Sequence, residues 1–95
     1  MYKYGFQNYF EANFTAFFPE VMQRGHWINV YLNFEFSKDT NLPADLIDPS
    51  ALVVFDQDGE VHDFIVHDEG VDSEYKFTDT EKKKMLDFIT EQKLI

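Results

Sequence analysis

The chain has 95 residues and no cysteine, which suits one domain with a small core and excludes disulfides, thiolate metal sites and cysteine nucleophiles. Its formal net charge is −10, from 18 acidic residues against eight Lys and Arg. This balance argues against direct binding to nucleic acid or an anionic membrane, where Lys and Arg normally neutralise phosphates. There is no signal-peptide pattern and no stretch near the roughly 18 consecutive apolar residues of a membrane span, so we expect a cytoplasmic protein.

The first predicted element covers residues 2–18. Apolar or aromatic residues occupy eight of its nine even positions, which favours a strand with one buried face. A helix is the alternative, because four phenylalanines in this stretch recur about once per helical turn. We expect Pro19 to interrupt the strand and residues 19–26 to form the connection to the next one.

The clearest predicted strand covers residues 27–36, where every even position is apolar. The alternate, odd positions are Trp27, Asn29, Tyr31, Asn33 and Glu35. We expect an antiparallel hairpin with the first strand that buries the even positions of both and turns the odd face to solvent or a partner. A loop over residues 37–50 follows, with Leu42, Leu46 and Ile47 packed beneath it.

Two shorter strands are predicted over residues 51–55 and 61–67, both rich in β-branched and aromatic residues. The turn between them, Asp56-Gln57-Asp58-Gly59, has the composition of a hairpin turn, with Gly59 in the left-handed conformation beside a bulge. An acidic connection, residues 68–76, comes next.

The last predicted element is a helix that runs to about Gln92. Thr78 and Glu81 have the spacing of a capping box, and the apolar residues that follow define one helical face. The order β-β-β-β-α therefore predicts an α+β fold in one domain, residues 1–95. In it, a four-stranded antiparallel sheet of two hairpins is covered on one face by the C-terminal helix.

The net charge is concentrated in one part of the sequence. Residues 41–74 contain ten acidic residues and no Lys or Arg, whereas residues 1–40 sum to −1 and residues 75–95 to +1. The acidic residues fall on predicted strands, turns and ordered connections, so we expect them to be fixed in space. A rigid array of negative charge predicts recognition of a basic surface on a partner protein.

We therefore predict a non-enzymatic acidic binding protein, of the inhibitor or immunity type or a mimic of nucleic-acid charge. Its partner would be a basic protein surface, such as the nucleic-acid groove of an enzyme. The expected phosphate-like charges are Asp56, Asp58, Glu60, Asp63, Asp68, Glu69, Asp72 and Glu74. Trp27 and Tyr31 are the expected apolar anchors, because aromatic residues are enriched at the centres of interfaces.

Other interpretations remain open. One is a homodimer or other self-associating structural protein that uses the exposed sheet face. Another is a weak Ca²⁺-binding module at the D-x-D-G-E turn of residues 56–60, although the full EF-hand spacing is absent. No cofactor, resident metal or catalytic residue is predicted. His62 and His67 are an odd number of residues apart, which predicts opposite faces of a strand and argues against a joint site.

Overall fold

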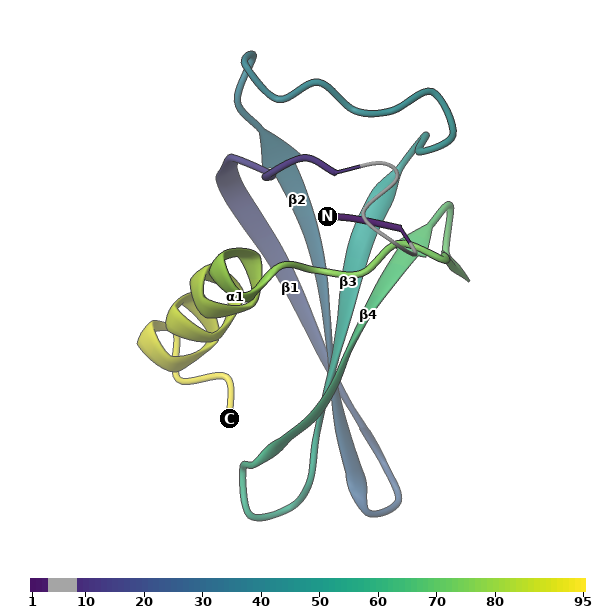
Figure 1. Cartoon of the computed structure of the whole chain (residues 1–95). Coiled ribbons are helices and arrows are strands. Elements are labelled where there is room, and N and C mark those ends of the chain that lie inside the picture. Colours follow the sequence, from purple (N-terminus) through teal and green to yellow (C-terminus); the bar gives the residue numbers. More distant parts are fainter. Residues whose placement is uncertain (4–8) are drawn as a thin grey trace.

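The computed structural model describes residues 1–3 and 9–95, and residues 4–8 of the first predicted element lie outside it. Figure 1 shows an antiparallel sheet in the order β1-β2-β3-β4-β5, followed by one helix. The elements are β1 (Phe14–Arg24), β2 (Trp27–Phe36), β3 (Pro49–Phe55), β4 (Val61–Asp68), β5 (Val71–Asp72) and α1 (Asp79–Glu91). The α+β class, the four main strands and the C-terminal helix are confirmed.

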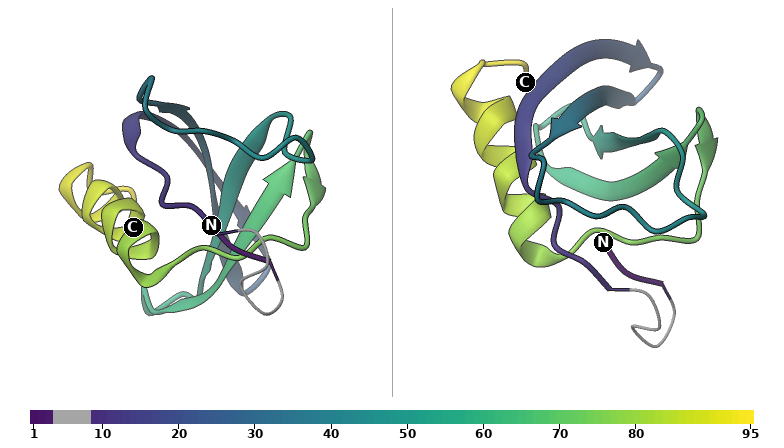
Figure 2. Two further views of the ribbon diagram at one scale, coloured as in Figure 1. Left: turned by 45° about the horizontal axis from the view of Figure 1, so that its top comes forward. Right: turned by 90° about the horizontal axis from the view of Figure 1, so that it is seen from above.

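The core lies between one face of the sheet and a cover made of α1, the segment that leads to it and the N-terminal segment. After β5 the chain crosses the sheet to reach α1, which lies beside β1 (Figure 1, Figure 2). Tyr2 exchanges two backbone hydrogen bonds with Lys76 in this crossing segment, at 2.9 and 2.7 Å. The fully buried residues include Val30, Leu32, Ala51, Val53, Val66, Tyr75, Phe77, Met85 and Ile89. The even positions of β2 face this core, as predicted.

β1 differs from the prediction in both its position and its pattern. It continues through Pro19 to Arg24, so the expected interruption is wrong; an edge strand tolerates proline where the missing N–H faces away from its neighbour. A bulge between Phe14 and Ala16 then shifts the alternation by one residue. As a result Phe17 faces the core opposite Phe34, and Phe18 is 52% exposed on the other face.

The hairpin turns use glycine at positions where the backbone has a positive φ. The predicted connection over residues 19–26 is only the two-residue turn Gly25–His26, and the φ of +60° at Gly25 is that of a type II′ hairpin. The predicted left-handed Gly59 is confirmed, with φ of +84°. The acidic connection holds a further tight turn, in which Glu69 and Gly70 both have positive φ and lead into β5.

The capping box at the start of α1 is confirmed. Thr78 Oγ1 accepts a hydrogen bond from Glu81 N at 3.2 Å, and a Glu81 oxygen accepts one from Thr78 N at 2.8 Å. The other carboxylate oxygen of Glu81 accepts from Ala12 N and from the α-ammonium of Met1, both at 2.7 Å. One buried side chain therefore fixes both the helix start and the N-terminal segment.

The loop between β2 and β3 is attached to the core side of the molecule. Leu46 is buried, as predicted, whereas Ile47 is 70% exposed and does not pack beneath the loop. Asp45 accepts hydrogen bonds from Lys3 Nζ and, at 2.8 Å, from Tyr75 Oη. These contacts hold the loop against the N-terminal segment and leave the opposite face of the sheet to β1–β4 themselves.

Candidate functional site

The candidate site is the face of the sheet opposite α1, which we call the outer face. The cross-strand pairing aligns Tyr31, Leu52 and Ile65 in one row of this face, each partly exposed. At its edges Phe18 is exposed, and Trp27 is 44% exposed. Apolar side chains thus form the middle of the outer face, Glu20 of β1 lies beside Tyr31 in the same row, and the predicted acidic residues lie toward the two ends.

The first acidic group lies where the β3–β4 turn meets the start of β2, and we call it the tip cluster. It contains Trp27, Asp56, Asp58, Glu60, His62 and Asp63. The rings of Trp27 and His62 are 4.9 Å apart at their centroids, and His62 Nε2 lies 3.0 Å from Asp56 Oδ2. Each described residue of the cluster except Asp56 is exposed. The side chain predicted as an anchor therefore stands among several of the predicted charges.

Asp56 organises this turn and is not a free charge. Its Oδ1 accepts hydrogen bonds from Glu60 N at 3.0 Å and Asp58 N at 2.9 Å. The bond from the Glu60 backbone, aided by His62 and by the Asp58 backbone, holds the pKa of Asp56 below its ordinary value. The exposed carboxylates Asp58, Glu60 and Asp63 have no ion-pair partner among residues 1–3 and 9–95.

The second group surrounds the β4–β5 turn, and we call it the β5 cluster. It contains Tyr31, Asp48, His67, Asp68, Glu69 and Asp72. Glu74, also predicted as one of the charges, instead lies within electrostatic range of Lys3 on the core side. His67 Nε2 lies 3.0 Å from Asp72 Oδ1, and the His67 ring is 6.4 Å from that of Tyr31. Asp68 Oδ1 accepts hydrogen bonds from the backbone N–H groups of Ile47 and Asp48, so it serves the loop as well as the surface.

The structure thus divides the predicted acidic array into two clusters. They lie at opposite ends of β4, about 20 Å apart given a rise of about 3.3 Å per residue in a strand. Each contains one of the two predicted aromatic anchors, Trp27 or Tyr31. Asp45 belongs to neither cluster, because its carboxylate accepts hydrogen bonds from Lys3 and Tyr75.

The expectation that His62 and His67 point to opposite faces is wrong. β4 has a register shift where Val54 pairs with Asp63 but Phe55 pairs with Val61, so His62 is the extra residue of a bulge. Both histidines therefore contact an aromatic ring of β2 on the outer face. Residue parity fails as a guide to side-chain direction across a bulge.

The outer face combines charged and aromatic side chains. The described part of the chain contains no group of residues suited to bind a metal ion. There, no three His, Asp or Glu side chains are grouped as metal ligands would be. The D-x-D-G-E turn instead directs Asp56 toward its own backbone and His62.

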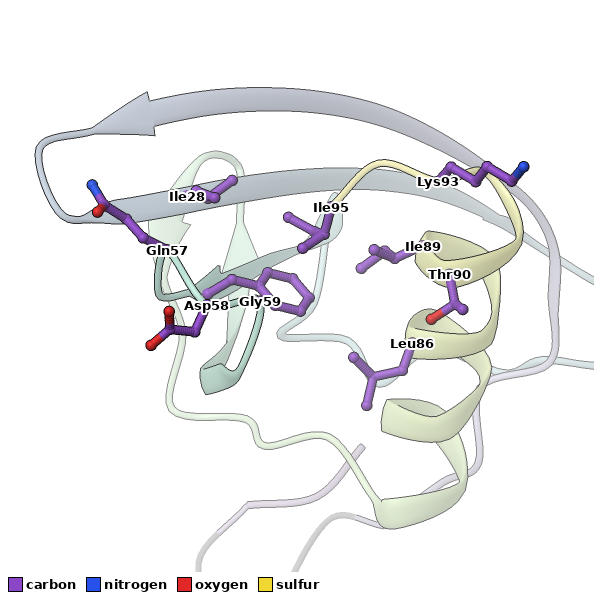
Figure 3. Close-up of a pocket in the computed structure, with 10 residues that line it drawn as sticks. Ile28, Gln57, Asp58, Gly59, Leu86, Ile89, Thr90, Lys93 and Ile95 are labelled. Carbon is purple, nitrogen blue, oxygen red and sulfur yellow. The ribbon is translucent and has the colours of Figure 1, made fainter.

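A cavity of about 460 Å³ lies on the opposite side, between the end of α1 and the β2–β3 side of the sheet (Figure 3). Its walls are mainly apolar, with Ile28, Leu86 and Ile89 directed inward, and Lys93 at the rim. Asp58 is the one acidic side chain among the described residues that line it. Asp58 and Lys93 are thus the two charged residues among the described residues that line it.

Sequence reasoning missed two participants of the outer face. Phe18 was expected in the core, and His62 was not expected beside Trp27. The sequence hardly indicates either position, because each depends on a β-bulge that contains no glycine or proline.

Comparison with protein-family models, with curated proteins and with solved structures found no match. Among the described residues, no helix has the length and apolar character needed to cross a membrane.

Proposed function

We propose that the protein is a non-enzymatic binding protein whose outer face docks on a basic surface of a partner protein. The observation that carries the proposal is the tip cluster, where exposed Trp27 stands beside carboxylates that have no ion-pair partner among the described residues. An aromatic anchor beside free charge suits an interface, because burial of the ring supplies affinity and the charge supplies steering.

Within this class, the exposed negative charge favours an inhibitor or immunity-type protein that binds a nucleic-acid-binding enzyme. Carboxylates at the two clusters would take the place of phosphates in the basic groove of the partner. Their separation of about 20 Å corresponds to about six base pairs at 3.4 Å per step, a length over which such a groove presents Lys and Arg. The β3–β4 turn carries the tip cluster at one end of β4, and the β4–β5 turn carries the β5 cluster at the other.

The first test is kinetic. Proteins of the host are captured on the immobilised chain and released at graded salt, and the association rate of the recovered partner is then measured. We expect association to slow markedly between about 0.01 M and 0.15 M salt, as the screening length falls from about 30 Å to about 8 Å. A partner whose association rate does not change with salt would contradict the proposal.

The second test uses matched variants. In the tip variant, Asp58→Asn, Glu60→Gln and Asp63→Asn remove three charges, and we expect the association rate to fall by about tenfold. The control removes three exposed charges elsewhere, through Asp39→Asn, Asp79→Asn and Glu91→Gln, and should change the rate much less. Trp27→Ala should act mainly on dissociation, raising its rate by about tenfold or more. If both triple variants slow association equally, the association rate depends on the net charge of the molecule and not on the tip cluster.

A further inference from the structure

One edge of the sheet is open. β1 is the first strand in the sheet order, and no strand of the described residues pairs with its other side. α1 contacts the beginning of β1, where the rings of Phe17 and Phe88 are 5.0 Å apart, but the β1–β2 hairpin extends away from the helix (Figure 1, Figure 2). Within the described part of the chain, residues 20–24 are therefore an unpaired strand edge.

The turn determines which backbone groups this edge presents. Because Gly25–His26 is a two-residue hairpin turn, Arg24 and Trp27 form the hydrogen-bonded pair that closes it. Hydrogen-bonded positions alternate along an antiparallel strand, so Val21 and Gln23 direct their N–H and C=O groups away from β2. Pro19 belongs to the same outward set, which explains how the ladder accepts a residue without an N–H.

The same edge is the neutral part of a strongly acidic molecule. β1 contains one acid, Glu20, and one base, Arg24, so its charges cancel. Both side chains are exposed, and neither forms an ion pair within residues 1–3 and 9–95. Two copies of a chain with net charge −10 repel each other, and β1 adds no net charge to that repulsion.

We propose that a second copy of this chain pairs with β1 along this edge, antiparallel, about a two-fold axis at Met22. Val21 then exchanges two backbone hydrogen bonds with Gln23 of the second copy, and the symmetry repeats the exchange. On the outer face the two Met22 side chains meet at the axis. Glu20 lies opposite Arg24 of the second copy on each side, which is the cross-strand arrangement that opposite charges favour.

The charges also select the register. A shift by two residues leaves Glu20 or Arg24 opposite a methionine, and a shift by four places like charges opposite each other. Only the Met22-centred register forms both ion pairs. The dimer joins two sheets edge to edge and leaves both outer faces free, so it does not depend on the proposed function.

Analytical ultracentrifugation over a range of concentrations tests the pairing. Glu20→Arg should weaken the dimer by about tenfold or more, because both cross-strand pairs change from attraction to repulsion. Arg24→Glu should do the same, and the double variant E20R/R24E should regain the affinity of the original chain. Glu35→Arg, which makes the same change of charge at an exposed site on β2, is the control and should keep the dimer. A chain that stays monomeric at every concentration, or a double variant that remains as weak as the singles, would overturn the proposal.

Amide hydrogen exchange tests the register directly. The N–H groups of Val21 and Gln23 should exchange more slowly as concentration rises and the dimer forms. The N–H of Met22 bonds to β2 in either state and should not respond. Exchange at Val21 and Gln23 that is independent of concentration would also overturn the proposal, and thermal unfolding of each variant confirms that it is folded.

Discussion

Glu81 is a charged side chain with no exposed surface. A buried carboxylate is tolerated only when it is hydrogen-bonded and paired, and Glu81 accepts from Thr78 N, Ala12 N and the α-ammonium of Met1. Removing it leaves these donors buried without an acceptor. A single residue therefore holds two distant segments of the chain together.

Glu81→Ala should lower the free energy of unfolding by about 3–5 kcal/mol, because it breaks a buried ion pair and leaves its partners unsatisfied. Urea denaturation followed by far-UV circular dichroism measures this difference. Glu91→Ala, at an exposed position of the same helix, is the control and should change the value by no more than about 0.5 kcal/mol. Similar values for the two variants would show that Glu81 contributes no more than a surface residue.

At the scale of the element, the β3–β4 hairpin depends on an ionised carboxylate. The Glu60 backbone, His62 and the Asp58 backbone together lower the pKa of Asp56 from its ordinary 3.8. A lowered pKa in the folded state means that the stabilisation is complete above 3.8 and is lost as the pH falls through the lower folded value.

Asp56→Asn should therefore be less stable than the original chain near neutral pH, and the difference should shrink as the pH falls below 3.8, the ordinary pKa of Asp56. Thermal unfolding of both proteins across this acidic range measures it. Asp58→Asn is the control, since Asp58 lies in the same turn and its carboxylate accepts no such bond from residues 1–3 and 9–95. A difference that stays constant with pH would mean that the charge of Asp56 does not stabilise the hairpin.

The elements that sequence predicted best are those whose local signals agree. β2 has unbroken alternation, and α1 has a capping box followed by an apolar face, so both appear where expected. β1 was misplaced because its alternation depends on a bulge before Ala16 and because Pro19 is permitted only on an edge strand. Edge position is a property of the whole sheet, so no local pattern contains it.

The candidate site was predictable in its composition and less so in its shape. The acidic residues and the two aromatic anchors could be named from sequence, because charge and side-chain type are explicit there. Their division into a tip cluster and a β5 cluster depends on the length of β4. The contact between Trp27 and His62 depends on the bulge in that strand. These are tertiary features that residue spacing alone does not determine.

At the scale of the molecule, net charge −10 on a small chain opposes folding through self-repulsion. Raising salt from about 0.01 M to about 0.15 M should raise the melting temperature by a few degrees, as screening shortens from about 30 Å to about 8 Å. The tip variant should melt higher than the original chain at low salt and respond less to added salt. A tip variant that melts lower would show that these carboxylates stabilise the fold, and would weaken the case that they serve binding.

The position of Glu81 also has a consequence for the order of events during synthesis. Its hydrogen-bond partners Ala12 and Met1 precede it by 69 and 80 residues. The strands β1 to β4 are made earlier and can pair as they leave the ribosome, because each pairs with its neighbour in sequence. The N-terminal segment, however, must wait for the final helix. Until then the apolar face of the sheet is uncovered. We therefore expect chaperones to bind a nascent chain most strongly when synthesis has stalled before Glu81.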